Sequence, residues 1–166
     1  MQRDLPSELL RAAVSAAQNA YAPYSRFAVG AAARTADGAV FVGANMENAS
    51  YGVTICAEVG ALQAASTVGK LPDVVQIAVA GGIMEEAGRP TGKIVTPCGR
   101  CRQLILESAH LGRRDVEVWC ADLDLTSVAC FKISELLPHG FGPATLGKGD
   151  GIKGTAFDSA HKLSNR

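Results

Sequence analysis

Segments with helical periodicity alternate with strand-like segments along this chain, and few architectures accommodate that order. Because the helical segments fall between strand-like ones, the chain should form a layered α/β domain with a mixed sheet of five strands. Helices are predicted over residues 4–20, 54–68, 98–109 and 134–137, and strands over residues 27–34, 39–45, 74–82, 115–121 and 126–133.

Local signals support several of these boundaries. Asp4 is placed as the N-cap of the first helix, with Pro6 in its first turn. The dipeptide Asp37-Gly38 separates the first two strands and is typical of a hairpin turn. Gly69 follows the second helix, where a residue with a left-handed backbone commonly ends a helix.

Length and composition indicate the number of domains, the cellular compartment and the kinds of partner to expect. Its 166 residues suit one domain, and five cysteines is an odd number for a disulfide framework. The first 20 residues carry Asp4, Glu8 and Arg11 where a signal peptide has its apolar core, so we expect a cytoplasmic protein with free or metal-bound thiols. No apolar run approaches the ~20 residues of a membrane span. Because 16 basic residues balance 16 acidic ones, we expect neither a membrane nor a nucleic-acid partner.

The segment PCGRC, residues 97–101, holds two cysteines at a spacing that suits a redox pair, half of a structural zinc clamp or part of a catalytic metal site. The preceding helix begins near Cys56 and Glu58, and helix N-termini favour thiolates. Three cysteines with a nearby carboxylate suit a zinc ion that has three protein ligands and one open position. A redox pair would leave Cys56 and Glu58 unexplained. A closed, non-catalytic zinc module with Cys120 or Cys130 as fourth ligand is an alternative.

The chemistry of such a site follows from its residue types. Zinc lowers the pKa of a bound water to ~7, which provides a strong nucleophile at neutral pH. Glu58 is placed to take a proton from that water and return it to a bound substrate.

The segments AYAPYSRFAVGAA, NMENASYG, CAE and PCGRCRQ occur in this order, and residues 9–141 resemble the small homotetrameric cytidine deaminases. The resemblance implies a three-layer helix–mixed sheet–helix fold. It implies hydrolytic deamination of cytidine or deoxycytidine in pyrimidine salvage, by a homotetramer that acts on a free nucleoside. Zn²⁺ would be held by Cys56, Cys98 and Cys101, with Glu58 as the proton shuttle.

The same resemblance implies a set of substrate-binding residues. Asn45 and Glu47 would hold the sugar hydroxyls, although a polar turn would have the same composition. Phe27 and Tyr51 would lie around the pyrimidine ring, since aromatic faces suit flat bases; Phe27 would suit the core equally well. Ala57 would contribute backbone groups rather than a side chain.

Phe141, in the segment ELLPHGF, matches a family position that closes the site of a neighbouring subunit, although an exposed aromatic near the end of the domain would look the same. We divide the chain into a cytidine deaminase-like catalytic domain, residues 1–143, and a Gly-rich C-terminal tail, residues 144–166. The tail and a long loop over about residues 82–96 are departures from the family.

A third departure is Val59, which stands where three-cysteine members usually carry an arginine. Arg100 lies between the two cysteines of PCGRC and is the candidate to supply the missing positive charge beside the thiolates, with Arg102 less well placed. Val59 and the combination of PCGRCRQ with ELLPHGF also resemble the blasticidin-S type of deaminase. A deaminase of a modified or antibiotic cytosine nucleoside is therefore an alternative function.

The remaining histidines and cysteines receive structural interpretations. His110, His139 and His161 follow no ligand spacing and are predicted to lie at the surface. Cys120 and Cys130 lie in apolar strands, where cysteine behaves as a small hydrophobic residue.

Overall fold

The computed structural model describes residues 5–84 and 93–147, and its centre is a five-stranded sheet with the strand order β2-β1-β3-β4-β5. β1 pairs antiparallel with β2 and β3, β3 pairs parallel with β4, and β4 pairs antiparallel with β5. The predicted mixed sheet of five strands is therefore confirmed. The strands are β1 (Phe27–Thr35), β2 (Val40–Ala44), β3 (Val74–Ile83), β4 (Glu117–Asp122) and β5 (Val128–Lys132).

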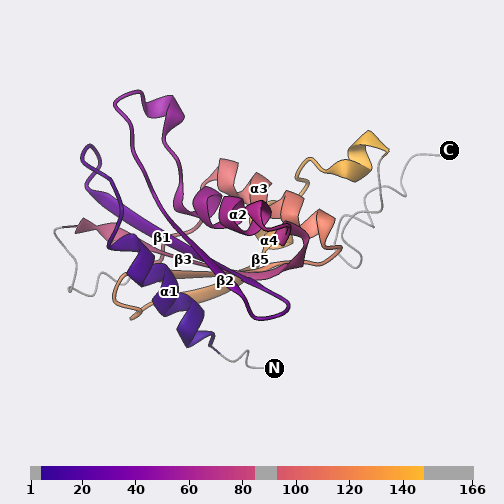
Figure 1. Ribbon diagram of the computed structural model, residues 1–166, viewed down its shortest axis with the longest axis horizontal. Helices are drawn as coiled ribbons and strands as arrows, with labels where there is room; N and C mark the ends of the chain where they lie inside the picture. The colour runs from indigo at the N-terminus through magenta and orange to yellow at the C-terminus, as the bar shows by residue number, and fades with distance from the viewer. Residues whose placement is uncertain (1–4, 85–92, 148–166) are drawn as a thin grey trace.

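Helices cover both faces of this sheet (Figure 1). On one face α1 (Ser7–Ala17) packs over a buried cluster that includes Trp119. On the other face α2 (Ala57–Thr67) and α3 (Gly99–Leu111) pack over a larger apolar cluster, with the short α4 (Ile133–Leu136) beside α3. The chain thus has the helix–sheet–helix layers that the resemblance implied.

Two glycines let helices lie directly against the backbone of the sheet. A Cβ added to Gly30 in β1 would lie 1.9 Å from the carbonyl oxygen of Ala13 in α1, and one added to Gly43 in β2 would lie 2.4 Å from the carbonyl oxygen of Ala57 in α2. Neither position has room for a side chain. Because the first turn of α2 rests on Gly43, the sheet sets where that helix begins.

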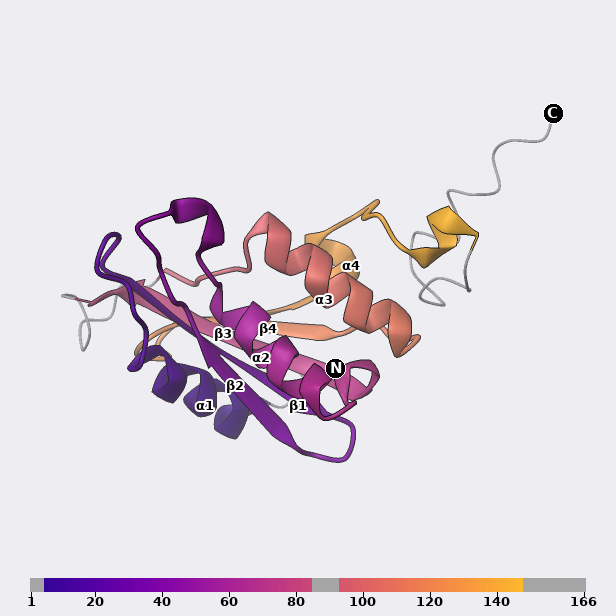
Figure 2. The ribbon, with the colours of Figure 1, turned by 45° about the horizontal axis from the view of Figure 1, so that its top comes forward.

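The N-termini of α2 and α3 lie side by side at one end of the sheet (Figure 2). α2 follows β2 and α3 follows β3, and both helices run back along the same face. α3 belongs to the crossover that connects the parallel strands β3 and β4, a connection for which a helix is the usual solution. Two segments far apart in the sequence therefore bring their helix starts together.

A row of polar side chains crosses four strands on the face that α1 partly covers. Arg34 Nη1 donates a hydrogen bond to Gln76 Oε1 (3.2 Å), and Gln76 Nε2 donates to Glu117 Oε2 (2.9 Å). Lys132 Nζ donates to Glu117 Oε1 at 3.2 Å. These residues are direct partners in the registers of β1 with β3, β3 with β4 and β4 with β5. We refer to them as the polar row.

The helix starts differ from the sequence prediction. Pro6 is the N-cap of α1 rather than a first-turn residue, and Asp4 lies outside the described residues. α2 begins at Ala57 instead of residue 54, because Tyr51–Val53 form a separate 3-10 helix. The other predicted helices and strands are present with their ends shifted by a few residues.

His110 is buried, so the prediction that it lies at the surface was wrong. It is 8% exposed, because the chain after α4 passes over it and Gly142 lies against its ring. Sequence spacing could not reveal this contact between segments that are distant along the chain. His139 is exposed as predicted, and His161 lies outside the described residues.

The segment predicted as a tail begins inside a short helix. Pro143–Leu146 form a 3-10 helix, whereas residues 148–166 lie outside the described part of the chain, as do residues 85–92 of the predicted long loop. The division of the chain at residues 143 and 144 stays a prediction. Within residues 5–84 and 93–147, no helix has the length and apolar character needed to cross a bilayer.

Candidate metal centre and active site

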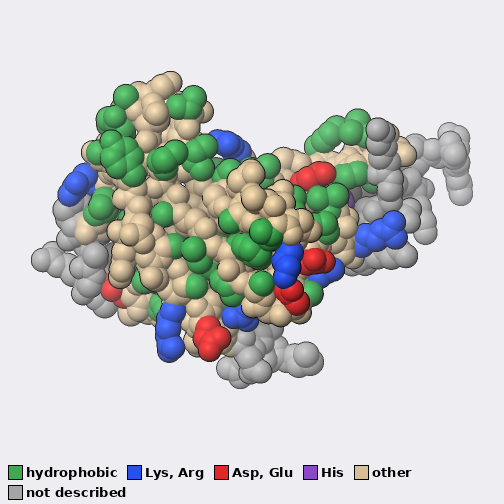
Figure 3. Space-filling view, in the orientation of Figure 1, with side chains coloured by type: hydrophobic (Ala, Val, Ile, Leu, Met, Phe, Trp, Pro, Cys, Tyr) green, Lys and Arg blue, Asp and Glu red, His purple; other side chains and the backbone are tan. Residues whose placement is uncertain are grey.

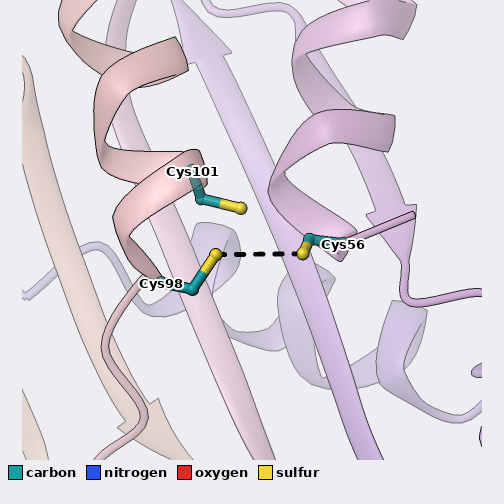
Figure 4. Close-up of side chains that lie close together, drawn as sticks. All are labelled: Cys56, Cys98 and Cys101. Atoms are coloured by element: carbon teal, nitrogen blue, oxygen red, sulfur yellow. Dashed lines mark hydrogen bonds between the residues drawn. The ribbon is translucent and has the colours of Figure 1, made fainter. Parts of the chain in front are cut away.

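Three cysteine thiols converge where α2 and α3 begin (Figure 4). Cys56 is the N-cap of α2 and Cys98 is the N-cap of α3, while Cys101 lies in the first turn of α3. The three Sγ atoms lie within 4.8 Å of one another, and Cys56 Sγ is 4.0 Å from Cys98 Sγ. Neither N-cap thiol forms a capping hydrogen bond, so both are available to the cluster.

This donor set fits zinc. Zn–S bonds of ~2.3 Å at a tetrahedral angle place two thiolates ~3.8 Å apart, close to the separation of Cys56 and Cys98. Among the described residues, only these three thiols form a group of three or more metal-ligating side chains, so neither Cys120 nor Cys130 supplies a fourth ligand. The arrangement matches a site with three protein ligands and one open position.

The three thiols are poorly suited to ionise together without a cation. Burial, followed by the charges of Glu58 and Cys56, raises the pKa of Cys101, and burial is also the main influence that raises the pKa of Cys56. Burial acts in the same direction on Cys98, but hydrogen bonds from the backbone and thiol of Cys101 outweigh it and lower the Cys98 pKa. A divalent cation among the sulfurs would reverse this balance.

Glu58 lies in the first turn of α2 beside the cluster and is 4% exposed. Burial raises the pKa of its carboxyl group above the ordinary value. Its carboxylate is not one of the grouped ligand atoms, yet Glu58 lines the same cavity as Cys56 and Cys98. The position suits a carboxyl group that handles protons next to a metal rather than one that holds it.

The cavity at the cluster has a volume of about 240 Å³ and adjoins a more open hollow of about 410 Å³. Thr54 lines both, so the two hollows are neighbours, one at the thiols and the other at the loop that contains Tyr51–Val53. The cavity is lined by Val29, Asn45, Thr54, Cys56, Ala57, Glu58, Val95, Thr96 and Cys98, and the hollow by Tyr24, Ser25, Glu47, Tyr51 and Thr54.

Asn45 lines the cavity and Glu47 lines the hollow, and both side chains are fixed by backbone groups. Asn45 Oδ1 accepts from the Val29 N–H at 2.8 Å, and Asn45 Nδ2 donates to the Phe27 carbonyl at 2.9 Å. Glu47 Oε2 accepts from the N–H groups of Tyr24 (2.9 Å) and Ser25 (3.2 Å). A hydrogen bond from the Ser25 hydroxyl is the largest influence and lowers the pKa of Glu47. Burial acts in the opposite direction, but the two N–H groups add to the lowering, so the Glu47 carboxylate stays ionised.

The other predicted site residues are spread more widely. Tyr51 lies at the rim and its ring meets Tyr24 edge to face, with centroids 5.9 Å apart. Phe27 begins β1 and is half-buried, and it lines neither the cavity nor the hollow. Phe141 is 57% exposed and also lines neither of them. Ala57, as predicted, meets the cavity beside Glu58.

Arg100 connects the starts of the two helices but does not bond to sulfur. Its Nη1 donates to the Thr54 carbonyl at 3.3 Å, two residues before Cys56. Arg102 points elsewhere, since its guanidinium donates to the carbonyl groups of Pro97 (2.8 Å) and Leu136 (3.0 Å). Of the two arginines, Arg100 is therefore the one that spans the cluster.

Several lining residues escaped the sequence analysis. Val95 and Thr96 directly precede PCGRC, and Thr54 lies two residues before Cys56, so closeness to a motif was the available signal. Val29 lies within the segment AYAPYSRFAVGAA, but only the pairing of β1 in the sheet shows that it reaches the cavity.

The sheet, the paired helix starts, the three thiols and the buried carboxylate define a zinc-binding α/β domain of the enzymatic rather than the closed structural kind. Residues 4–114 match the family described as the cytidine and deoxycytidylate deaminase zinc-binding region, and the chain belongs to this family.

Named relatives agree with this assignment. A cytidine deaminase of Halalkalibacterium halodurans is 45% identical over 135 residues, which are 80% of this chain and 91% of the relative. A cytidine deaminase of Mycobacterium tuberculosis is 45% identical over 105 residues, or 63% of this chain and 72% of the relative. The crystal structure of a cytidine deaminase from Burkholderia pseudomallei superposes with a TM-score of 0.71 at 41% identity, covering 82% of this chain and 99% of the other.

Proposed function

We propose that this chain catalyses the zinc-dependent hydrolysis of cytidine and deoxycytidine to uridine and deoxyuridine, with release of ammonia. The observation that carries the proposal is the convergence of three thiols at two helix N-termini with Glu58 in the wall of the same cavity. The cytidine deaminases named above, which match most of their own length to this chain, support the choice of base.

Cys56, Cys98 and Cys101 would hold the zinc ion, which when bound activates a water as nucleophile by lowering its pKa to ~7. A carboxylate oxygen of Glu58 takes the proton of the attacking water and delivers it to the ring nitrogen beside the amino-bearing carbon. Once the new C–O bond has formed, Glu58 takes the remaining proton of the added hydroxyl and passes it to the amino group. The carbonyl then forms as the C–N bond breaks and ammonia leaves. The backbone of Ala57, next to Glu58 in the cavity wall, is the proposed partner of the ring carbonyl.

Asn45 and Glu47 bind the sugar hydroxyls. One N–H of the Asn45 amide bonds to Phe27 and the second is left for a hydroxyl, while Glu47 has one carboxylate oxygen beyond the one that accepts backbone N–H groups. Tyr51, which lines the hollow, would flank the base and the sugar. Phe27 lines neither hollow, and its role beside the base rests on the family resemblance alone. An ionised Glu47 would repel a phosphate on the sugar, which favours a free nucleoside over a nucleotide.

The active form is a homotetramer in which Phe141 of one copy closes the site of a second copy. Exposed apolar side chains support assembly, among them Met46, Tyr51 and Val53 on the loop that rises from the domain in Figure 1 and carries apolar surface in Figure 3. We place the enzyme in the cytoplasm, in pyrimidine salvage, because a reducing compartment keeps the cluster thiols able to bind metal.

Zinc analysis and an activity panel test the proposal. The full chain should hold one zinc per copy and change the ultraviolet absorbance of cytidine and deoxycytidine, with weaker activity on cytosine and cytidine monophosphate. Equal activity on free cytosine would remove the sugar role from Asn45 and Glu47. Preference for blasticidin S over cytidine would contradict the proposed substrate.

A matched pair of cysteine variants tests the ligand set. Cys98→Ser should lose zinc and activity together, whereas Cys130→Ser, at a half-buried strand position outside the cluster, should retain both. Zinc-loaded protein that deaminates none of these compounds would contradict the enzymatic proposal.

A further inference from the structure

The chain after α4 runs alongside α3 and carries Phe141 with it (Figure 2). We call residues 139–142 the strap. The backbone of the strap is held, since Gln103 Nε2 of α3 donates to the Phe141 carbonyl at 2.7 Å. The side chain of Phe141 nevertheless remains 57% exposed. A fixed backbone with an exposed aromatic side chain is the arrangement expected of a group held out toward a partner.

Two glycines bring the strap into direct contact with α3. A Cβ added to Gly140 would lie 2.4 Å from Leu106 Cδ2, and one added to Gly142 would lie 2.4 Å from His110 Nε2. Gly142 has extended backbone angles (φ −147°, ψ 175°) that any residue adopts, so only the imidazole excludes a side chain there. Contact with α3 accounts for Gly142, and contact with both Leu106 of α3 and Leu137 accounts for Gly140. Neither glycine has a left-handed backbone.

The α3 side of this contact is a single helix face. Gln103, Leu106 and His110 are spaced three and four residues apart, which places them in one line along the helix. His110 is buried, and neither of its ring nitrogens has a hydrogen-bond partner among the residues the structure describes. Burying an imidazole without hydrogen-bond partners is unfavourable. Because His110 gains no hydrogen bond here, we attribute its role to the contact of its ring with Gly142.

We propose that Gln103, Leu106 and His110 are positioning residues for the reaction: they seat the strap so that Phe141 enters the substrate site of a second copy of the chain. The inference rests on the proposed function, and it assigns to one face of α3 the positioning of Phe141. Phe141 lines neither hollow of its own copy, so the proposed contact with substrate requires a second copy.

The first experiment compares kinetic constants of zinc-loaded, assembled variants. Phe141→Ala should raise KM for cytidine about 2- to 12-fold, as expected for loss of one aromatic contact. Gly142→Ala should raise KM in the same range by displacing the strap. Leu146→Ala removes another exposed apolar side chain, 63% exposed, a few residues after the strap, and should leave KM unchanged.

Combining variants separates positioning from general damage. In the Phe141→Ala background, Gly142→Ala should add no further rise in KM, because the displaced group is already absent. Gly142→Ala combined with His110→Ala should recover part of the Gly142→Ala loss, since the smaller side chain makes room for the new Cβ. If Gly142→Ala does not fold, Gln103→Ala, which removes only the bond to the Phe141 carbonyl, takes its place in the same comparison.

The outcomes distinguish this inference from the proposed function. If the wild-type chain does not deaminate cytosine nucleosides, the proposed function fails. If the wild type is active and Phe141→Ala raises KM, but Gly142→Ala and Gln103→Ala do not, the proposed role of α3 in positioning the strap is wrong while the proposed function stands. Additive losses with Phe141→Ala, an equal rise in Leu146→Ala, or an unchanged KM in Phe141→Ala would each overturn the positioning role.

Discussion

At the scale of single residues, Glu58 has the clearest consequence. Because it is 4% exposed and lies beside the thiols without joining their group, Glu58→Gln should keep its zinc and its affinity for nucleoside. Turnover should fall by more than the ~10²–10⁴-fold of one acid–base step, since the residue serves several proton transfers. Metal analysis and single-turnover kinetics measure both properties.

Glu8→Gln is the matched control, because Glu8 is also a first-turn carboxylate but lies exposed on α1, across the sheet. It should behave as wild type. Loss of zinc in Glu58→Gln would instead identify Glu58 as a metal ligand.

A second residue-scale prediction concerns Arg100. We propose that its guanidinium, held by the Thr54 carbonyl across the start of α2, offsets the negative charge of the three thiolates in place of the arginine missing at Val59. Arg100→Ala should lower zinc affinity or activity about 10- to 100-fold. Arg100→Gln should recover little, and adding Val59→Arg to Arg100→Ala should recover part. Wild-type zinc affinity and activity in Arg100→Ala would leave the two helix N-termini to balance the charge.

His110 gives a prediction about pH. Burial lowers its pKa below the ordinary 6.5, although the charge of Glu107 acts in the opposite direction. The unfolded chain therefore takes up a proton at pH values where the folded chain does not. The free energy of unfolding should thus fall as the pH drops through 6.5 toward the folded-state pKa.

Thermal unfolding from about pH 7.5 to about pH 5.5 measures this effect. Wild type should lose more stability over that interval than His110→Gln, which cannot titrate. Parallel pH dependences for the two proteins would rule the effect out.

At the scale of secondary-structure elements, much of the architecture was predictable because the periodicity of apolar residues and the turn residues that mark helices and strands are local features of the sequence. The hairpin at Asp37-Gly38 and the order of the elements follow from residues close together in the sequence. The three thiols were predictable because two of them share one motif. The contact between the strap and α3 was not predictable from the sequence. It joins His110 to Gly142, and β4 and β5 lie between these residues along the chain.

Gly43 and Gly30 form a matched pair for testing how the sheet places its helices. Gly43→Ala would push against the first turn of α2, between Ala57 and Ala61, and should lower zinc affinity as well as stability. Gly30→Ala would push still closer against the backbone of α1 on the opposite face and should lower stability alone, by about 1–3 kcal/mol. Denaturant titrations and zinc competition measure the two effects. Equal zinc affinity in both variants would show that the start of α2 tolerates displacement.

At the scale of the whole molecule, the assembly is the quantity to measure. Four copies of the 17.2 kDa chain would total about 69 kDa in sedimentation or light-scattering experiments. The exposed Met46, Tyr51 and Val53 should become protected from solvent in the assembled form. A monomer that is fully active would contradict both the tetramer and the role of Phe141 at a second site.

The polar row has a consequence for how the chain avoids misfolding. Its four members sit on four different strands, so sliding any one strand by a single residue would turn a charged or amide side chain toward the apolar layer beneath α2 and α3. An unpaired polar group in that layer is costly, which raises the free energy of every shifted register relative to the native one. Lys132, on the outermost strand β5, also places a charge at an open edge, where another chain would otherwise add a strand. The polar row thus disfavours both shifted strand registers and aggregation through the edge of the sheet.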